Sequence, residues 1–306
     1  MFYHGKVRIE YREEPCKVAL NHVKGMPFEW SLNPYMGCAH QCTFCYVRAF
    51  ERRADRPADH RYGTSIRVKV NVAEVLRAEL ARPSWHGDGI AIGAATDPYQ
   101  PAEGRYRLTR ACLEVLRDAA TPFSLITRGP MIVRDVDVLA DAAGRADVAV
   151  TFSVPTIDDE IWRKTEPGTA PPRQRLRAVK TLVEAGIRTG VGMAPLLPGL
   201  SDHPRELERV VVAAREAGAC GVWANLLYLK PGTREHFLEC LARDWPELLP
   251  EYETFYERRA YLPNDVARPA KETVRRLAKL HGIADRRPEP LRPPARDEQL
   301  SLLPTA

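Results

Sequence analysis

The sequence predicts an α/β fold in which a parallel sheet is wrapped by helices. Beyond residue 70, short apolar runs typical of buried strands alternate with amphipathic helical patterns, as expected for successive βα units. The chain has 306 residues, of which 44% are hydrophobic. That length and that share of apolar residues are sufficient for one large α/β domain with a substantial core.

The expected elements follow one another along the chain. A first strand is expected at residues 28–32, and residues 64–70 and 73–81 show the periods of a strand and an amphipathic helix. Buried strands are expected at 89–96, 122–128, 147–154, 188–195 and 221–229. Helices are expected at 110–119, 135–143, 172–185, 204–217, 248–259 and 269–281. The strand at 28–32 and the five buried strands form a six-strand βα series.

Four regions are expected along the chain. Residues 1–27 mix charge and aromatics without a clear period and form an N-terminal extension, and residues 28–245 carry the βα series. Residues 246–283 form a C-terminal helical segment, and residues 284–306 contain five prolines. That last region is expected to be an extended, largely disordered tail.

Composition narrows the class of protein. The seven cysteines are not spaced as a disulfide framework, the first residues lack the apolar core of a signal peptide, and no apolar run could span a bilayer. We therefore expect a cytoplasmic protein with no membrane partner. The net charge is +5, and residues 46–69 hold seven basic residues against three acidic ones. This stretch predicts either a solvated face or a surface that contacts phosphates.

Three cysteines fall within eight residues, at Cys38, Cys42 and Cys45, and Gly37 allows the backbone to turn just before them. Thiolates at C-x3-C-x2-C spacing can hold three irons of one cubane, whereas a cluster that only carries electrons normally has a fourth cysteine. One iron would then be open to another ligand. The alternative is a structural zinc site completed by His40 or Cys16, although such sites usually show two separated ligand pairs.

The triad resembles the signature of the radical S-adenosylmethionine (SAM) superfamily, which has an aromatic residue just before the third cysteine; Phe44 fills that position. The resemblance implies a partial (β/α)6 TIM-type barrel and a 4Fe-4S cluster whose open iron binds SAM. It also implies cleavage of SAM to a 5′-deoxyadenosyl radical, with an electron from a reductant such as flavodoxin or ferredoxin.

A second motif, Thr96-Asp97-Pro98-Tyr99-Gln100, follows the strand at 89–96. It resembles the loop that binds the methionine amine of SAM in the spore photoproduct lyase branch of that superfamily. Thr96 and Asp97 are therefore the expected amine contacts. The resemblance also implies roles for other strand ends: the SAM carboxylate on Arg128, a polar contact from Ser153, adenine against Phe44 and Tyr46, and a turn at Gly199 beside the ribose.

The branch differs from this chain at one position. Spore photoproduct lyase returns hydrogen from a cysteine in the loop after its second strand, and the matching position here is Ala94. Tyr99 and Cys112 are the nearby candidates for the missing donor. Cys112 also fits the apolar face of the helix at 110–119, where it would be a core residue.

The tail carries a separate motif, Gln299-Leu300-Ser301-Leu302-Leu303. It resembles the pentapeptide by which bacterial DNA polymerases and repair proteins bind the sliding clamp, and a flexible tether suits such docking. The expected function is that of a radical SAM enzyme, lyase-like or transferase, acting on DNA in lesion repair. The alternatives are a radical SAM enzyme acting on RNA, a peptide or a small molecule, and a clamp-tethered DNA-binding protein that carries a cluster without turnover.

Overall fold

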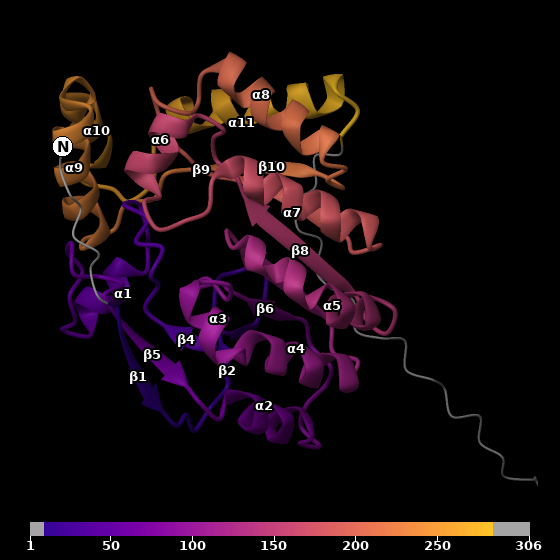
Figure 1. Cartoon of the computed structure of the whole chain (residues 1–306). Coiled ribbons are helices and arrows are strands. Elements are labelled where there is room, and N and C mark those ends of the chain that lie inside the picture. The colour runs from indigo at the N-terminus through magenta and orange to yellow at the C-terminus, as the bar shows by residue number, and fades with distance from the viewer. Residues whose placement is uncertain (1–8, 284–306) are drawn as a thin grey trace, which may run out of the picture.

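The computed structural model describes residues 9–283 and contains a central sheet of seven strands (Figure 1). Their spatial order is β10 (Val222–Leu226), β9 (Thr189–Leu196), β8 (Val148–Ser153), β7 (Phe123–Thr127), β6 (Ile90–Ile92), β3 (Trp30–Leu32) and β2 (Leu20–His22). The six strands from β3 to β10 are parallel neighbours, and β2 is antiparallel to β3. The predicted α/β fold with six parallel strands is confirmed; within residues 9–283 the sheet is open, with β10 and β2 at its ends.

Amphipathic helices follow the strands and cover the sheet from outside (Figure 1). They are α2 (Val72–Leu80), α4 (Leu108–Asp118), α5 (Val136–Ala143), α7 (Pro172–Glu184) and α8 (Pro204–Glu216). Each lies within one or two residues of the predicted range, because each carries buried apolar residues at helical spacing. In α8, for example, Leu207, Val210, Val211 and Ala214 are buried.

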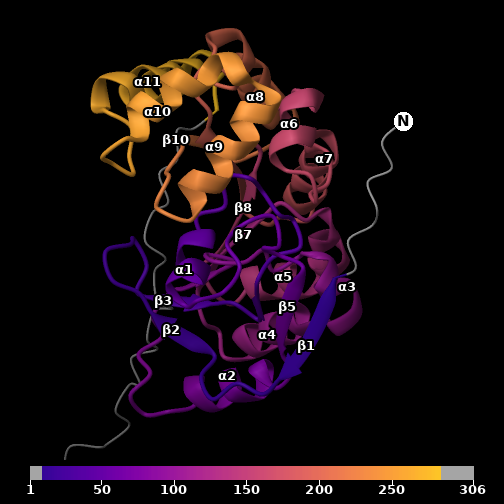
Figure 2. The ribbon, with the colours of Figure 1, turned by 90° about the vertical axis from the view of Figure 1, so that its left-hand side faces the viewer.

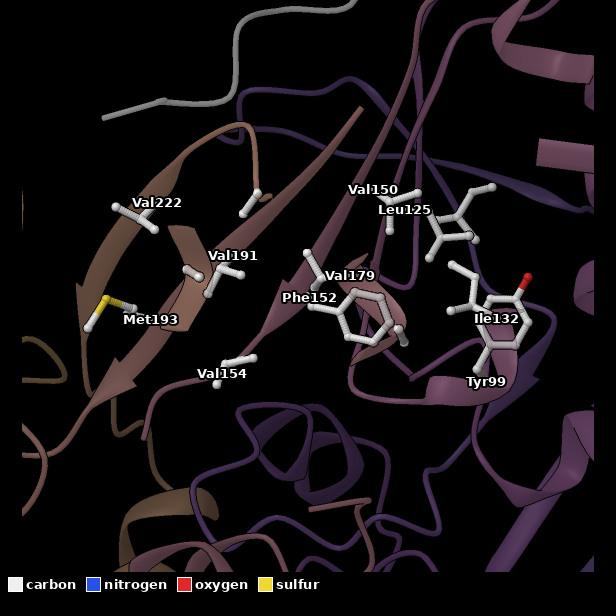
Figure 3. Packing of buried hydrophobic residues seen from close by; sticks show 14 of the residues in the cluster. Tyr99, Leu125, Ile132, Val150, Phe152, Val154, Val179, Val191, Met193 and Val222 are labelled. Carbon is white, nitrogen blue, oxygen red and sulfur yellow. The ribbon is translucent and has the colours of Figure 1, made fainter. Parts of the chain in front are cut away.

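The core lies between this helical layer and the strands. Figure 3 shows Phe152 of β8, Val154 just after it, Val191 and Met193 of β9, and Val222 of β10 among its members. Along β7 and β8 the fully buried side chains of this core alternate with half-buried ones, so each strand has one face in the core.

The strand predicted at 64–70 has a different place from the others. It is β5 (Ser65–Lys69), which lies in a separate three-stranded sheet between β1 (Glu10–Glu14) and β4 (Tyr35–Met36). The expected N-terminal extension therefore contributes one strand to each sheet, β1 here and β2 in the central sheet. Alternating hydrophobicity predicts a strand but says nothing about the strand with which it pairs.

The C-terminal helices differ from the predicted ranges: the helix at 233–244 was not predicted, the one predicted at 248–259 is shorter, and the one predicted at 269–281 is longer. They are α9 (Thr233–Asp244), α10 (Leu249–Tyr256) and α11 (Asn264–Leu280), and α11 packs on α8 and β10. Helix α11 begins five residues before the predicted start and contains Pro269, because Ala270, Val274, Leu277 and Ala278 form one buried face. Figure 2 shows these helices at one end of the molecule, above α1 (Arg48–Arg53).

Several short elements were not predicted: α1, α3 (Pro101–Tyr106), α6 (Asp159–Thr165) and two 3-10 helices, η1 (Pro130–Asp135) and η2 (Pro246–Leu248). No helix among residues 9–283 is long and apolar enough to cross a bilayer. The tail at 284–306, with its Gln299–Leu303 motif, lies outside the described residues.

Candidate functional site

The three cysteines lie on the loop after β4, between the first strand of the parallel series and α1. Cys38 and Cys42 are buried, and Cys45 is partly buried. Gly37, at φ +85, makes the turn that the sequence predicted. Burial raises the pKa of the Cys42 thiol to about 12. A bound cation would favour the thiolate form of Cys42 at neutral pH.

Other loops hold the cysteine loop in place through its backbone. Gln100 accepts a hydrogen bond from Ala39 N and donates one to the carbonyl of Gly37, both at 3.0 Å. Thr233, at the start of α9, donates to the carbonyl of Cys45 at 3.0 Å. Gly168 N donates to the carbonyl of His40 at 3.0 Å. The loop is thus fixed by segments that follow three different strands.

Two glycines allow this close packing. A Cβ at Gly63 would stand 2.3 Å from the carbonyl oxygen of Cys38, and one at Gly168 would stand 2.5 Å from that of Ala39. Only glycine fits at these distances, since real Cβ contacts are not this short. The cysteine loop is therefore enclosed on two sides by backbone.

The residues considered for a zinc site have other neighbours. His40 Nδ1 lies 3.3 Å from Asp97 Oδ2, and the backbone of Cys16 exchanges hydrogen bonds with the Asn71 side chain. Among residues 9–283, no group of three or more His, Cys, Asp and Glu side chains is arranged to hold one metal ion. The structure therefore brings neither His40 nor Cys16 to the triad as a fourth ligand.

Asp97 connects three strand-end loops. Its Oδ1 accepts hydrogen bonds from Tyr99 N at 2.9 Å and Thr127 Oγ1 at 2.6 Å, and its Oδ2 accepts one from Arg128 N at 2.7 Å. Burial opposes the charge of this carboxylate, but the nearby His40 and these donors outweigh burial and lower its pKa to about 2. Asp97 is therefore an anion with its acceptor sites largely occupied by the chain.

Thr96 is also engaged by the chain. Its hydroxyl donates to the carbonyl of Tyr35 at 2.8 Å, and its backbone N donates to Asn33 Oδ1 at 3.3 Å. The loop predicted to bind the amine is thus joined directly to the segment that leads into the cysteines.

Arg128 lies beside the cysteines at the end of β7. Its guanidinium is 5.6 Å from the centre of the Phe44 ring, and it donates from Nη2 to the carbonyl of Ala194 at 3.1 Å. Its Nε donates to Glu166 Oε1 at 2.5 Å. The guanidinium is held from several sides, and its side chain is 19% exposed.

Glu166 also pairs with a second arginine. Arg175 Nη1 lies 3.0 Å from Glu166 Oε2, and both side chains are fully buried. Arg175 Nη1 also donates to the carbonyl of Ser153, at the end of β8, at 2.9 Å. The buried carboxylate therefore links the arginine at the end of β7 to the end of β8.

Glu166 and Arg175 are not among the residues predicted from the sequence. Glu166 lies in a loop with no period to mark it, but Arg175 carries a usable signal. It occupies the apolar face of α7, in register with Ala178, Val179 and Leu182. A charged residue on such a face is rarely buried without a partner.

The remaining predicted cofactor contacts lie at other strand ends or on the loop itself. Ser153 is buried at the end of β8, and Gly199, at φ +71, donates from its N to Asp202 Oδ1 at 2.8 Å. Phe44 is buried. Tyr46 is 40% exposed, and its ring meets that of Phe50 edge to face, with centroids 6.0 Å apart.

The two predicted hydrogen donors lie within the core. The hydroxyl of Tyr99 donates to Asp135 Oδ2 at 3.0 Å, and Figure 3 shows its ring beside Ile132. Cys112 is fully buried on the inner face of α4, which matches its alternative interpretation as a core residue. The packing gives no support to either side chain as a donor.

The arginines of the basic stretch after the cysteines have different environments, from fully buried to exposed. Arg48 is buried and donates from Nη1 to the carbonyls of Ala58 and Asp59, at 2.9 and 2.5 Å. Arg56 pairs with Glu51, and Arg61 with Asp59. The loop closed by these contacts places Tyr62 beside Cys45, with 3.5 Å between the hydroxyl oxygen and Sγ. Sequence analysis did not select Tyr62.

The family model described as "Radical SAM superfamily" matches residues 32–211, which span the cysteine loop and the strands from β3 to β9. The chain belongs to the radical SAM superfamily. It is therefore a radical SAM enzyme, and its cofactors are a 4Fe-4S cluster and SAM, as the cysteine triad predicted. The donor set fits that cluster: three cysteines on one buried loop, without a fourth cysteine beside them.

Relatives of this radical SAM enzyme include an uncharacterized protein of Mycobacterium tuberculosis (strain ATCC 25618 / H37Rv). It is 39% identical over 286 residues, which cover 92% of this chain and 84% of the relative. An uncharacterized protein of Acidianus two-tailed virus is 26% identical over 224 residues, 69% of this chain and 71% of that protein. The radical SAM Nalpha-GlyT isomerase of Pseudomonas phage M6 is 27% identical over 171 residues, 56% of this chain and 34% of that protein.

Among solved structures, the fold resembles a spore photoproduct lyase variant with bound AdoMet and dinucleoside spore photoproduct. The TM-score is 0.68, the sequence identity is 15%, and the match covers 89% of this chain and 79% of that one. This likeness shows that the partial barrel and the surrounding helices have the same arrangement in both proteins.

Proposed function

We propose that this radical SAM enzyme acts on DNA, in a lesion-repair reaction related to that of photoproduct lyases. One observation carries the proposal: exposed aromatic and basic side chains lie together beside the cysteine loop. Tyr46 and Phe50, 40% and 45% exposed, stand on the same side of α1 next to Cys45, and the exposed Arg52 and Arg53 follow. Aromatic faces stack on unpaired bases, and arginines neutralise phosphates.

A second aromatic pair follows the end of β10. The rings of Tyr228 and Tyr261 are 4.3 Å apart, and Lys230 Nζ lies 5.4 Å from the Tyr228 ring. The segment that carries Tyr228 and Lys230 ends at Thr233, which hydrogen-bonds the carbonyl of Cys45. Both pairs are thus connected to the cysteine loop, where a nucleotide would have to enter. The fold likeness to a lyase with a bound dinucleoside agrees with such a substrate.

The proposed roles of the chain's residues follow their positions. Cys38, Cys42 and Cys45 hold the cluster, and when bound and reduced it supplies the electron that cleaves SAM to a radical able to take a hydrogen atom from the substrate. Arg128, oriented by Glu166, binds the SAM carboxylate through a charge-assisted hydrogen bond.

The other SAM contacts are assigned to the loops around the triad. The negative charge of Asp97 and the loop of Thr96 attract the methionine amine. Phe44 and Tyr46 flank the adenine, Ser153 supplies a polar contact, and Gly199 turns the chain near the ribose.

The return of hydrogen has to differ from that in spore photoproduct lyase, since Ala94 has no thiol to supply it. Neither Tyr99 nor Cys112 is retained as the donor, because both are enclosed by the core. A hydrogen atom would come from another group or from the deoxyadenosine formed in the first step. A cluster held by thiolates needs a reducing compartment, which agrees with the cytoplasmic location expected from the composition.

The proposal is tested on protein reconstituted anaerobically with iron and sulfide. Wild type, Cys42→Ala and the control Cys16→Ala are given dithionite and SAM, and 5′-deoxyadenosine is measured by chromatography. We expect product from wild type and Cys16→Ala, none from Cys42→Ala, and faster formation when ultraviolet-damaged DNA is added.

Each other outcome would change the conclusion. Product that rises with RNA or a peptide and not with DNA would assign the enzyme to another substrate. A cluster without product under any condition would leave only the binding protein considered in the sequence analysis.

The sliding clamp is a further proposed partner through Gln299–Leu303, which lie outside the described residues. An extended segment with one amide and three leucines suits an apolar groove. Purified clamp is expected to bind wild type and not the double variant Gln299→Ala/Leu302→Ala. Equal binding of the two proteins, or binding of neither, would contradict this partner.

A further inference from the structure

We infer that Tyr62 donates a hydrogen bond to the sulfur of Cys45 and, with the buried guanidinium of Arg48, raises the reduction potential of the cluster. The inference rests on the ligand role proposed for Cys45 and not on the nature of the substrate. It assigns a role to a residue seventeen positions beyond the cysteine triad.

The geometry places Tyr62 directly against the ligand. The hydroxyl oxygen is 3.5 Å from Cys45 Sγ, and the Tyr62 side chain packs with Cys38 and Val47 in one buried cluster. Only 3% of Tyr62 is exposed, so water does not compete freely for its hydroxyl. An iron-bound cysteine is a thiolate and can only accept a hydrogen bond, whereas a phenol keeps its proton at neutral pH. The tyrosine is therefore the donor.

The position of Tyr62 is built into the loop and does not depend on a flexible side chain alone. Tyr62 N donates to the carbonyl of Asp59 at 2.9 Å, and the same carbonyl accepts from Arg48 Nη1. The next residue, Gly63, is packed against the carbonyl of Cys38. The backbone on both sides of Tyr62 is thus tied to the cysteine loop or to the helix that follows it.

Arg48 adds a buried positive charge. Its guanidinium carbon lies 4.6 Å from the centre of the Tyr62 ring, and only 1% of the residue is exposed. Because Arg48 is three residues beyond Cys45, the start of α1 brings this charge to the same side of the loop. Arg56 and Arg61, later in the same loop, form ion pairs with carboxylates. Arg48 instead donates hydrogen bonds to two neutral carbonyls.

The direction of the effect follows from electrostatics. One-electron reduction, by dithionite or by a low-potential protein donor, adds a negative charge to the cluster and its thiolates. A hydrogen bond to a ligand sulfur and a nearby cation both favour the more negative state, and both act strongly where water is excluded. Removal of the hydroxyl should therefore make the cluster harder to reduce.

The test compares wild type, Tyr62→Phe and the control Tyr106→Phe. Tyr106→Phe also removes one phenol hydroxyl, but that hydroxyl donates a hydrogen bond to Glu13 on the surface. Each protein is reconstituted anaerobically, and its midpoint potential is measured by redox titration followed by electron paramagnetic resonance, without SAM or substrate. We expect a more negative potential for Tyr62→Phe and the same potential for wild type and Tyr106→Phe.

Several results would overturn the inference. A potential of Tyr62→Phe that is unchanged or less negative than that of wild type would contradict it. So would a Tyr62→Phe protein that is folded by circular dichroism but no longer holds a cluster. If Tyr62→Phe does not fold, wild type decides the question: its reduced cluster in D2O should show a strongly coupled exchangeable deuteron by double resonance, and the absence of that signal would contradict the bond. Loss of the cluster in Cys45→Ala tests the ligand role separately.

Discussion

At the residue scale, the site depends on a buried charge group that connects strand ends distant in sequence. Glu166 lies between Arg128 and Arg175, with all of its side chain and that of Arg175 removed from solvent. The two cations require this carboxylate, because an unpaired charge in such a place is strongly unfavourable. The carboxylate thus orients Arg128 toward the cysteine loop and also stabilises the fold.

Replacement of Glu166 by glutamine keeps the shape of the side chain and removes its charge. We expect Glu166→Gln to lower the free energy of unfolding by about 3–5 kcal/mol, because two buried guanidinium groups lose their counter-ion. Urea unfolding followed by circular dichroism measures this change. The matched control is Glu184→Gln, whose carboxylate is 64% exposed and makes a surface pair with Lys180. Equal stability of the two variants would contradict the role of Glu166.

Arg128 is expected to contribute to SAM affinity through a guanidinium of fixed orientation. Arg128→Lys keeps the positive charge but loses the fork of donors that holds Glu166 and the carbonyl of Ala194. We expect SAM to bind roughly 10–100-fold more weakly, as for the loss of one hydrogen bond to a charged group. Calorimetric titration of reconstituted protein with SAM measures this, with Arg145→Lys as the control, because the Arg145 side chain is exposed after the end of α5 and pairs with Asp141. Unchanged affinity in Arg128→Lys would rule out the proposed carboxylate contact.

At the scale of elements, the cysteine loop is positioned by close backbone contacts and not by its own secondary structure. Comparison of Gly63 with Gly87 separates two effects of a glycine-to-alanine change: the strain of a positive φ and the steric overlap of the added Cβ. Both have positive φ, +80 and +79, but a Cβ at Gly63 would overlap the carbonyl of Cys38, whereas nothing lies within 4 Å of one at Gly87.

Both glycine-to-alanine variants therefore incur the cost of a left-handed alanine, about 1–2 kcal/mol. Only Gly63→Ala must also displace the cysteine loop. We expect Gly87→Ala to take up iron and sulfide as wild type does, and Gly63→Ala to retain markedly less, as measured by iron content and visible absorbance after reconstitution. Similar iron content in both variants would show that the loop tolerates the shift.

Secondary-structure patterns predicted the elements better than their partners. The six parallel strands could be predicted from short apolar-rich runs, since at least one face of each strand is buried. The strand β5 alternates just as clearly, yet it pairs with β1 and β4 in another sheet. Helix α11 passes through Pro269 because its buried face on α8 and β10 outweighs one lost hydrogen bond, a balance that local sequence does not contain.

At the scale of the whole molecule, nucleic-acid binding should depend on the exposed aromatic pair beside the cysteine loop. We expect Tyr46→Ala/Phe50→Ala to weaken binding of single-stranded or damaged DNA by about 1–3 kcal/mol for each stacked base. Fluorescence anisotropy of a labelled oligonucleotide measures the change. Val70→Ala/Val133→Ala, which shortens two exposed apolar side chains elsewhere, is the control and should bind as wild type does.

The arginines of the same surface should set the salt dependence of binding. If Arg52 and Arg53 each neutralise one phosphate, their joint replacement by alanine should reduce the slope of log affinity against log salt by about 1.4 for a single strand. Arg82→Ala/Arg215→Ala, which removes two exposed arginines elsewhere, one in the turn after α2 and one in α8, should leave the slope unchanged. A slope that is equal in all three proteins would place the phosphate contacts elsewhere.

The sequence by itself determined the class of chemistry. The triad has three cysteines within eight residues and no fourth cysteine beside them. This ligand set can be read directly from the sequence, because all three cysteines lie on one loop. The six-strand series and most helices are local in the same sense, since burial on one or both faces leaves a period in the sequence. The family and its cofactors were implied by the resemblance of the cysteine triad to the radical SAM signature, and the family model confirms them.

The tertiary structure decided which residues surround the triad. Glu166 and Tyr62 reach the site from loops with no local sign of function, and the place of Arg175 on an apolar helix face does not reveal its partner. Cys112 and Tyr99 are close to the motif in sequence but enclosed by the core. Within the basic stretch, Arg48 is buried against two backbone carbonyls, whereas Arg56 and Arg61 form ion pairs nearer the surface. Ion pairs and hydrogen bonds form between groups that are close in space. Those distances are fixed only when strands far apart in sequence lie side by side.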